Sequence, residues 1–314
     1  MTTTSDALRG NLVETKRSTG LWSDAFSRLR KNKLAMVGLF LVILLAFLAI
    51  FGPYIAPYPY QEQDLAAVMA NGGQPVKPGD PAHILGTDRI GRDLLSRLLD
   101  GARISMTVAL VVQLVVLGIG VPIGAMAGWF GGRADNLLMR FTDVMYAFPD
   151  LLFIILLSVA FSDTAFGKAM DGLLLVFVAI GLTIWVTVAR LVRGQLLSLK
   201  ETEFVEAARA IGVSDRKIVT KHLLPNSISP VIVAVTLGIP AAILAEATLA
   251  YIGIGVQPPR ASWGSLVSEG QDYIRSDPHL VFFPAIFIAV ALISFTFLGD
   301  GLRDALDPKL KGKQ

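Results

Sequence analysis

The sequence contains no cysteine, which excludes a disulfide framework and any thiolate metal or redox site. Charged residues are also scarce, because they make up 17% of the chain, whereas soluble domains carry about a quarter. Hydrophobic residues reach 53%, so the composition indicates a membrane protein rather than an ordinary soluble domain. The formal net charge of +3 gives no indication of nucleic-acid binding.

The sequence also lacks the common catalytic motifs. It has no Gly-x-x-x-x-Gly-Lys-Ser/Thr phosphate loop, no His-Glu-x-x-His zinc site and no Gly-x-Ser-x-Gly nucleophile elbow. Its three histidines, His83, His222 and His279, fall in separate segments, which argues against a shared metal site. We therefore expect no enzymatic activity and no cofactor or metal bound by this chain. A transporter without its own nucleotide-binding site must take its energy from an ion gradient or from a partner.

Six apolar runs are each long enough to cross a hydrocarbon layer of ~30 Å. The predicted fold class is an all-α membrane protein with six transmembrane helices in residues 34–302. In the second run, Gly120, Gly124 and Gly128 share one helical face, which predicts close packing against a neighbouring helix. The predicted spans are Leu34–Gly52, Ile104–Trp129, Leu137–Phe161, Gly172–Val192, Ile228–Gly253 and Leu280–Leu298.

The distribution of lysine and arginine predicts which loops lie inside the cell. The set formed by residues 1–33, Arg133, residues 196–227 and the tail 303–314 contains 17 of these residues, and the outer set contains seven. By the positive-inside rule, both termini and the loop 196–227 are cytoplasmic, whereas 53–101 and 254–279 are outer loops. We expect residues 1–20 to be disordered, and the residues from Leu21 to Lys33 to form a helix at the inner interface.

The outer loop 53–101 begins with an irregular stretch rich in proline and glycine. Leu94 and Leu98 then recur at helical spacing, which predicts a half-buried helix along the outer interface before the second span. The sequences Gly-Thr-Asp and Gly-Arg-Asp, which contain Asp88, Arg92 and Asp93, favour turns. A solvated charged turn without further function is an equally good interpretation of each of these three residues.

A charged, alanine-rich stretch at Glu201–Pro225 separates the fourth and fifth spans. Thr202 can cap a short helix, and Gly212 can end it in a left-handed conformation. Ser214 offers a new N-cap, so two short helices are expected to meet at a bend. One helical face would carry Phe204, Ala207, Ala208 and Ile211, which leaves a shallow surface suited to docking. The alternative is an amphipathic linker on the membrane surface.

Two acidic residues fall within predicted spans, where an unpaired carboxylate is costly. Asp150 lies in the sequence Phe-Pro-Asp of the third span, and Glu246 lies in the outer half of the fifth. Each should therefore face protein or water rather than lipid. We consider both as candidates for the transport pathway, with a structural role between helices as the alternative.

The order Glu206-Ala207-Ala208, Gly212 and Leu224-Pro225 resembles the signature loop of ABC-importer permeases, although His222 stands where the general pattern has an aliphatic residue. Three further stretches strengthen the likeness. With them, the chain resembles the C-type permease subunit of dipeptide and oligopeptide importers, whose relatives also carry nickel or other small solutes. These stretches are Gly86–Asp93, Gly253–Pro259 with Trp263-Gly264, and Gly299–Pro308.

The resemblance implies a type I ABC-importer permease fold in the bacterial cytoplasmic (inner) membrane, surrounded by membrane lipid. It also implies a second permease subunit in a heterodimer, two cytoplasmic ATPases that bind ATP and Mg, and an extracytoplasmic solute-binding protein. The residues implied in ATPase coupling are Glu206, Ala207, Ala208, Arg209, Gly212, Ser214 and Asp215. Those implied in docking of the binding protein are Asp88, Arg92, Asp93, Pro258 and Trp263.

The main interpretation is therefore half of the pathway of an ATP-driven importer of di- and oligopeptides. A proton-coupled secondary transporter is the first alternative, because acids within a membrane can relay protons. An ABC permease for nickel or another small solute is the second. A membrane-embedded enzyme lacks a recognisable nucleophile, base or metal cluster.

Overall fold

The computed structural model describes residues 21–307. The predicted disorder of residues 1–20, and most of the predicted tail 303–314, lie outside the described residues. Within them the chain is helical and forms no β-strand, apart from an isolated bridge between Thr87 and Asp93. The all-α prediction is therefore confirmed for the described part of the chain.

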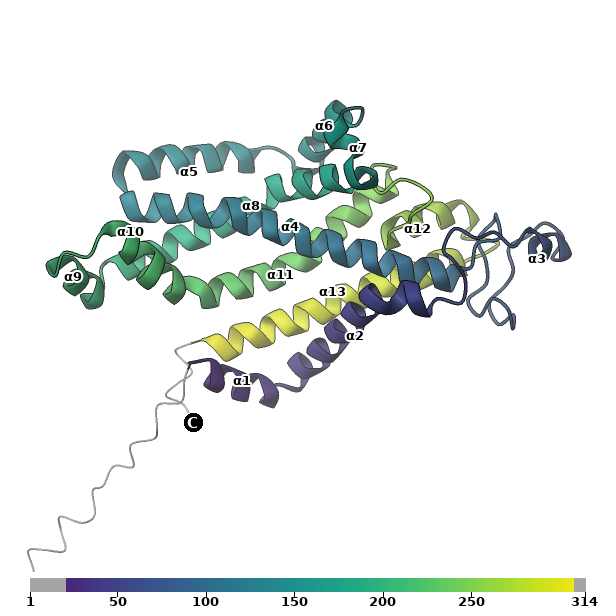
Figure 1. Ribbon diagram of the computed structural model, residues 1–314, viewed down its shortest axis with the longest axis horizontal. Helices are drawn as coiled ribbons and strands as arrows, with labels where there is room; N and C mark the ends of the chain where they lie inside the picture. The colour runs from purple at the N-terminus through teal and green to yellow at the C-terminus, as the bar shows by residue number, and fades with distance from the viewer. Residues whose placement is uncertain (1–20, 308–314) are drawn as a thin grey trace, which may run out of the picture.

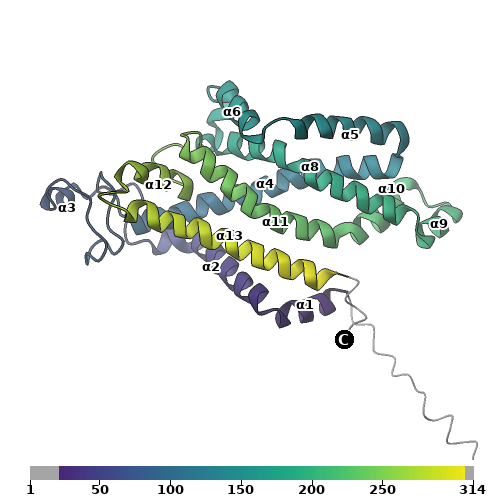
Figure 2. The same cartoon turned by 180° about the vertical axis from the view of Figure 1, so that it is seen from behind.

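Five long helices run side by side along the molecule (Figures 1 and 2). The described residues hold five helices long and apolar enough to cross a membrane, or six if the bent pair α5 and α6 forms one span. Each long helix overlaps one predicted span. The last of them continues to Leu306, beyond the predicted boundary at residue 302. The five are α2 (Lys33–Ile55), α4 (Leu94–Phe130), α8 (Leu173–Lys200), α11 (Leu224–Tyr251) and α13 (His279–Leu306).

The third predicted span is not one straight helix. It is divided into α5 (Gly132–Ala147) and α6 (Asp150–Phe161), whose axes differ by 86°. The break falls at Phe148 and Pro149, because a residue before proline is pushed out of the helical region, and Phe148 has a ψ of 136°. The span predicted from Leu137 to Phe161 is therefore broken into two helices at this point.

The helix predicted along the outer interface is instead the first part of α4. Asp93 is its N-cap and accepts a hydrogen bond from the Ser96 amide at 2.8 Å. Leu94 and Leu98 are buried in a core that includes Trp263. Protein rather than lipid headgroups covers this apolar stripe, which explains why the segment continues straight into the second span.

The glycine repeat of α4 packs against α8, as predicted. A Cβ atom added at Gly120 would lie 2.9 Å from the Trp185 carbonyl oxygen, and one added at Gly128 would lie 2.8 Å from Leu196 Cβ. At Gly124 the added atom would collide with the Ala189 carbonyl oxygen. The two backbones can approach this closely only because glycine has no side chain.

The remaining elements gather at the two ends of the helix bundle (Figure 1). One end, here called the α9 end, carries α9 (Glu203–Ala210) and α10 (Asp215–Ile218). The described ends of the chain, α1 (Leu21–Lys31) and the last turn of α13, lie in the same half. The opposite end is called the α3 end. It carries α3 (Leu65–Ala70), α7 (Ala165–Lys168) with η1 (Ala169–Gly172), and α12 (Trp263–Gly270) with η3 (Gln271–Tyr273).

The N-terminal helix α1 packs against the last helix. Ala25 and Leu29 are buried with Ala35 and Ala305, and the Arg28 guanidinium donates a hydrogen bond to the Asp307 carbonyl oxygen at 3.1 Å. Its other face is open. The helix predicted at Leu21–Lys33 is thus present in this part of the chain, and it joins the beginning of the first long helix to the end of the last.

Candidate functional site

The segment between α8 and α11 forms two short helices that meet at a glycine bend. Residues 203–218 are here called the knob. Gly212 has a φ of 78°, its amide donates to the Arg209 carbonyl oxygen at 2.9 Å, and the Val213 amide donates to the Ala208 carbonyl oxygen at 3.0 Å. This pair of hydrogen bonds is a Schellman cap, which needs a left-handed residue at its centre. The predicted pair of helices and the role of Gly212 as their bend are confirmed.

The two predicted N-caps have the backbone but not the side-chain contact of a cap. Thr202 and Ser214 occupy the N-cap positions of α9 and α10, and neither side chain accepts a capping hydrogen bond. The Thr202 hydroxyl instead donates to the Leu199 carbonyl oxygen at 2.5 Å. Thr202 therefore stabilises the end of α8 rather than the start of α9.

One side of the knob is seated firmly on the bundle. Val205 and Ile218 are fully buried in the main core, and Ala208 is 8% exposed. The Arg209 guanidinium lies over the ring of Trp129 at the end of α4, 4.9 Å from its centroid. These buried side chains and the contact between Arg209 and Trp129 hold the knob against the bundle, because closely packed side chains resist compression.

The other side of the knob is an exposed apolar surface with no partner in the described chain. Phe204 is 41% and Ile211 81% exposed, and Ala207 lies exposed between them on the same helical face. A Cβ atom added at Gly212 would meet no atom within 4 Å. The predicted face is corrected in one member, because Ala208 points into the bundle with Val205. The other predicted coupling residues, Glu206, Arg209, Ser214 and Asp215, are exposed.

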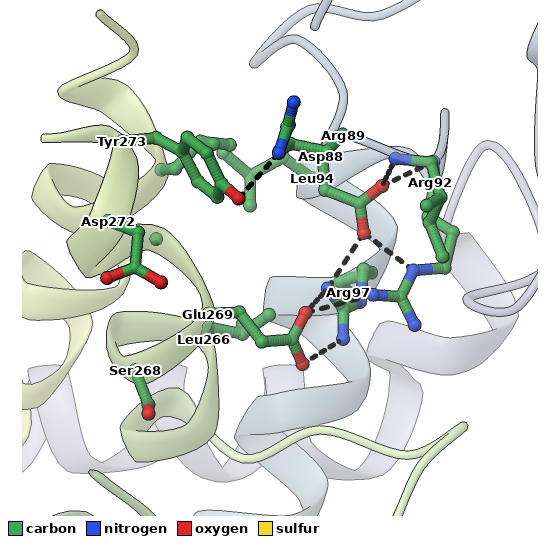
Figure 3. A pocket seen from close by; sticks show the side chains of 13 residues that line it. Asp88, Arg89, Arg92, Leu94, Arg97, Leu266, Ser268, Glu269, Asp272 and Tyr273 are labelled. Carbon is green, nitrogen blue, oxygen red and sulfur yellow. Dashed lines mark hydrogen bonds and ion pairs between the residues drawn. The ribbon is translucent and has the colours of Figure 1, made fainter.

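At the α3 end, an ion cluster ties the turn before α4 to α12 (Figure 3). Arg97 is 1% exposed, and its guanidinium donates to Asp88 at 2.9 Å and to both Glu269 oxygens at 2.6 and 2.9 Å. Arg92 joins the same two carboxylates at 2.6 and 2.9 Å. Burial raises the pKa of Glu269, but the hydrogen bonds and charges of Arg97 and Arg92 outweigh burial and hold it below its usual value.

Two further contacts join the loop 53–101 to the region around α12. Arg89 lies 4.3 Å from the centroid of the Tyr273 ring and donates to its hydroxyl at 2.6 Å. Lys77 pairs with Asp277 at 2.5 Å. Glu269 and Tyr273 could not be recognised as partners from the sequence, because the pairs are separated by 177 and 184 residues.

The predicted docking residues fall into two groups. Asp93 is 1% exposed and lies 3.0 Å from His83 Nδ1, and Trp263 is fully buried and donates its indole N–H to the Leu98 carbonyl oxygen at 3.2 Å. In this structure these two side chains hold the segment together and offer no surface to a partner. Pro258 is exposed, whereas Asp88 and Arg92 belong to the ion cluster.

The two acids predicted to lie within spans are on different elements and are not brought together. Asp150 is exposed at the first position of α6, beside the break. Glu246 is 2% exposed, and one carboxylate oxygen accepts a long hydrogen bond of 3.5 Å from the Ser105 hydroxyl of α4. Its other oxygen has no hydrogen-bond partner among the described residues. The structure favours a position between helices for Glu246.

The family described as binding-protein-dependent transport system inner membrane components matches residues 120–312. A second family, the N-terminal transmembrane domain of oligopeptide transport permease C, matches residues 20–73. The chain belongs to the family of binding-protein-dependent transport system inner membrane components. The permease is 41% identical to the oligopeptide transport system permease protein OppC of Bacillus subtilis, over 94% of this chain and 92% of that protein. It is 43% identical to the dipeptide transport system permease protein DppC of the same organism, over 92% and 86% respectively.

Among solved structures, the permease is similar to a chain of the MetNI methionine ABC transporter in an inward-facing conformation. The TM-score is 0.55 and the identity 19%, over 66% of this chain and 94% of that one. This likeness shows a shared ABC-importer permease fold. The family is a transport component, in agreement with the interpretation of the signature loop at Glu206–Gly212.

Proposed function

We propose that this permease is the membrane subunit through which a bacterial ATP-driven importer moves short peptides across the cytoplasmic membrane. The relatives named above, and a relative named as a glutathione transport system permease, support this substrate class. Their names favour it over the proton-coupled and nickel-transporting alternatives. The second permease subunit, which would complete the pathway, belongs to this proposal.

In the proposed topology the chain crosses the membrane six times, with α5 and α6 together forming the third crossing. The α9 end faces the cytoplasm, and the α3 end faces outward. The excess of lysine and arginine in the inner loops supports this orientation. The solute-binding protein would then be received at the α3 end, where the exposed Pro258 and the surface around the ion cluster lie.

The observation that carries the proposal is the exposed apolar side of the knob. Phe204, Ala207 and Ile211 project from a helix whose opposite side is buried, so the surface is rigid and has no partner in the described chain. A surface of this kind indicates a protein partner. In the proposed mechanism this partner is the ATPase, which binds ATP and Mg and moves the knob when its two copies close.

The absence of cysteine allows a direct test of both the partner and the orientation. In an Ala207→Cys variant, a thiol-directed photocrosslinker should capture a protein that hydrolyses ATP, and a membrane-impermeant maleimide should not label it in intact cells. Met69, which is 76% exposed on α3, provides the matched control. A Met69→Cys variant should be labelled from outside and should capture no ATPase.

The reverse labelling pattern would contradict the orientation. Capture of an ATPase at neither position, in a transporter that still hydrolyses ATP and takes up peptide, would contradict the coupling role of the knob.

A further inference from the structure

A cavity of about 470 Å³ lies at the α3 end, apart from the ion cluster. Its walls come from α6, the turn formed by α7 and η1, the start of α8, and the loop that follows α11. It is here called the α6–α8 cavity, and the residues used below are Ser158, Lys168, Asp171, Val176, Ile254 and Gln257. Its volume lies in the range of about 300–1,000 Å³ that is common for small-molecule sites.

A buried hydroxyl without a partner lies in the wall of this cavity. Ser158 is 6% exposed, and its Oγ atom makes no hydrogen bond within the described chain. A buried polar group of this kind is costly unless something binds it. The lining also includes the apolar residues Val176 and Ile254, so the cavity offers the hydroxyl together with apolar surface.

The rim carries one positive and one negative side chain. The Lys168 side chain is 68% exposed and lies 3.9 Å from Asp163, which is itself fully exposed. The Asp171 side chain is 63% exposed and lies 3.5 Å from Arg260. Ion pairs this long and this exposed contribute little, so both charges are available to a ligand. One cation and one carboxylate on the same rim suit a zwitterion better than a simple anion or cation.

The backbone that carries the rim is held in an unusual conformation. Met170 and Asp171 have φ values of 54° and 58°, in the left-handed region that residues other than glycine rarely adopt. The backbone N–H of Gln257 donates a hydrogen bond to the Asp171 carbonyl oxygen at 3.4 Å and holds this turn against the loop after α11. Conformations of this kind persist where the surroundings impose them, and they are frequent at ligand-binding sites.

We propose that the α6–α8 cavity binds the two charged ends of a di- or tripeptide before it crosses the membrane. Lys168 pairs with the ligand's carboxylate, Asp171 pairs with its ammonium group, and Ser158 hydrogen-bonds a peptide group between them. Val176 and Ile254 contact an apolar side chain. A sphere of this volume is about 10 Å across, comparable with the roughly 7–11 Å of two or three extended residues. The inference rests on the proposed peptide-import function and adds a site to it.

The test uses the whole transporter in nanodiscs, without the solute-binding protein, and measures equilibrium binding of tri-alanine. N-acetylated and C-amidated tri-alanine each lack one terminal charge. The wild type should bind free tri-alanine at least about tenfold more tightly than either blocked peptide, since tenfold corresponds to one charged contact of about 1.4 kcal/mol.

Each rim variant should lose its preference for free tri-alanine over only one of the two blocked peptides. Lys168→Met should bind the amide as well as the free peptide and still reject the acetylated form, whereas Asp171→Asn should do the converse. Ser158→Ala should weaken all three peptides by a similar factor. Asp163→Asn and Arg275→Met remove an exposed charge from a neighbouring outer segment and should keep the wild-type pattern.

The proposal is overturned if the wild type binds no tri-alanine at millimolar concentration, or if the rim variants keep the wild-type pattern. Phosphatidylethanolamine retained by the wild type and lost in Lys168→Met would assign the cavity to a lipid headgroup instead. Uptake assays with the binding protein present separate this inference from the proposed function. If the wild type takes up peptide and the rim variants take it up equally well, only the role of the cavity is contradicted. If the transporter takes up another solute but no peptide, the proposed function is contradicted.

Discussion

Replacing Arg97 with methionine should release the loop 53–101 from α12. The side chain is 1% exposed and makes three hydrogen bonds to the carboxylates of Asp88 and Glu269. Bonds to charged groups contribute about 1.5–3 kcal/mol each, and loss of a buried partner costs about 3–5 kcal/mol.

Two features reduce this cost. Both carboxylates still have Arg92 as an ion-pair partner, and the Glu269 side chain is 40% exposed and is therefore screened by solvent. We expect local opening to become easier by about 2–3 kcal/mol, which is roughly 30- to 150-fold in the opening equilibrium.

A thiol placed at a buried position within the loop can measure this opening. Val76 is 8% exposed, and its amide and carbonyl both bond to Thr87, the residue before Asp88. The chain has no other thiol, so a Val76→Cys variant reports opening through its rate of labelling. Adding Arg97→Met should raise that rate by the factor given above. Arg133→Met removes an exposed arginine at the α9 end and should leave it unchanged. Equal rates in all three proteins would refute the role of Arg97 as a clamp.

Three further predictions concern the bend, the helix contact and the ion cluster. Gly212→Val should leave membrane insertion intact, because the site is open, but its positive φ should distort the bend and separate ATP hydrolysis from uptake; unchanged uptake would contradict the coupling role. Gly124→Leu should abolish accumulation of the folded permease on immunoblots of membranes, whereas Gly118→Leu, at a position where an added Cβ atom meets no atom within 4 Å, should not. Because the pKa of Glu269 is lowered, its contribution to stability should be complete above pH 4.5 and lost as the pH falls through the lowered pKa, which hydrogen-exchange protection of residues 86–97 would reveal.

The elements that could be predicted from the sequence are those with local causes. Long apolar runs give the spans, and Gly212 gives the bend in the knob, because hydrophobic periodicity and left-handed backbone are properties of nearby residues. The break in the third span also has a local cause, the sequence Phe148-Pro149. It was missed because proline is tolerated within other helices of this chain, such as α11 at Pro230 and Pro240.

The elements that could not be predicted depend on contacts between distant segments. The start of α4 has the amphipathic pattern of an interfacial helix, and only its cover by the region around Trp263 makes it part of a core. Arg97 finds Glu269 after 172 residues, and Lys168 and Gln257 meet at one cavity from two different loops. No spacing rule within a single element indicates such pairs.

The knob and the α6–α8 cavity lie at opposite ends of the same two helices. α8 begins beside the cavity and is separated from α9 by two residues. The short π-helix η2 (Val219–Leu223) follows the knob, and α11 begins directly after it and leads into the loop that contains Ile254. Each helix has 28 residues, or about 42 Å at 1.5 Å per residue, enough to cross the membrane. Because Val205 and Ile218 bury the knob against the core of these helices, we expect a movement of the knob to tilt both. In the proposed mechanism this tilt separates the cavity walls that the two helices carry, so that the cavity releases its ligand when the ATPase closes.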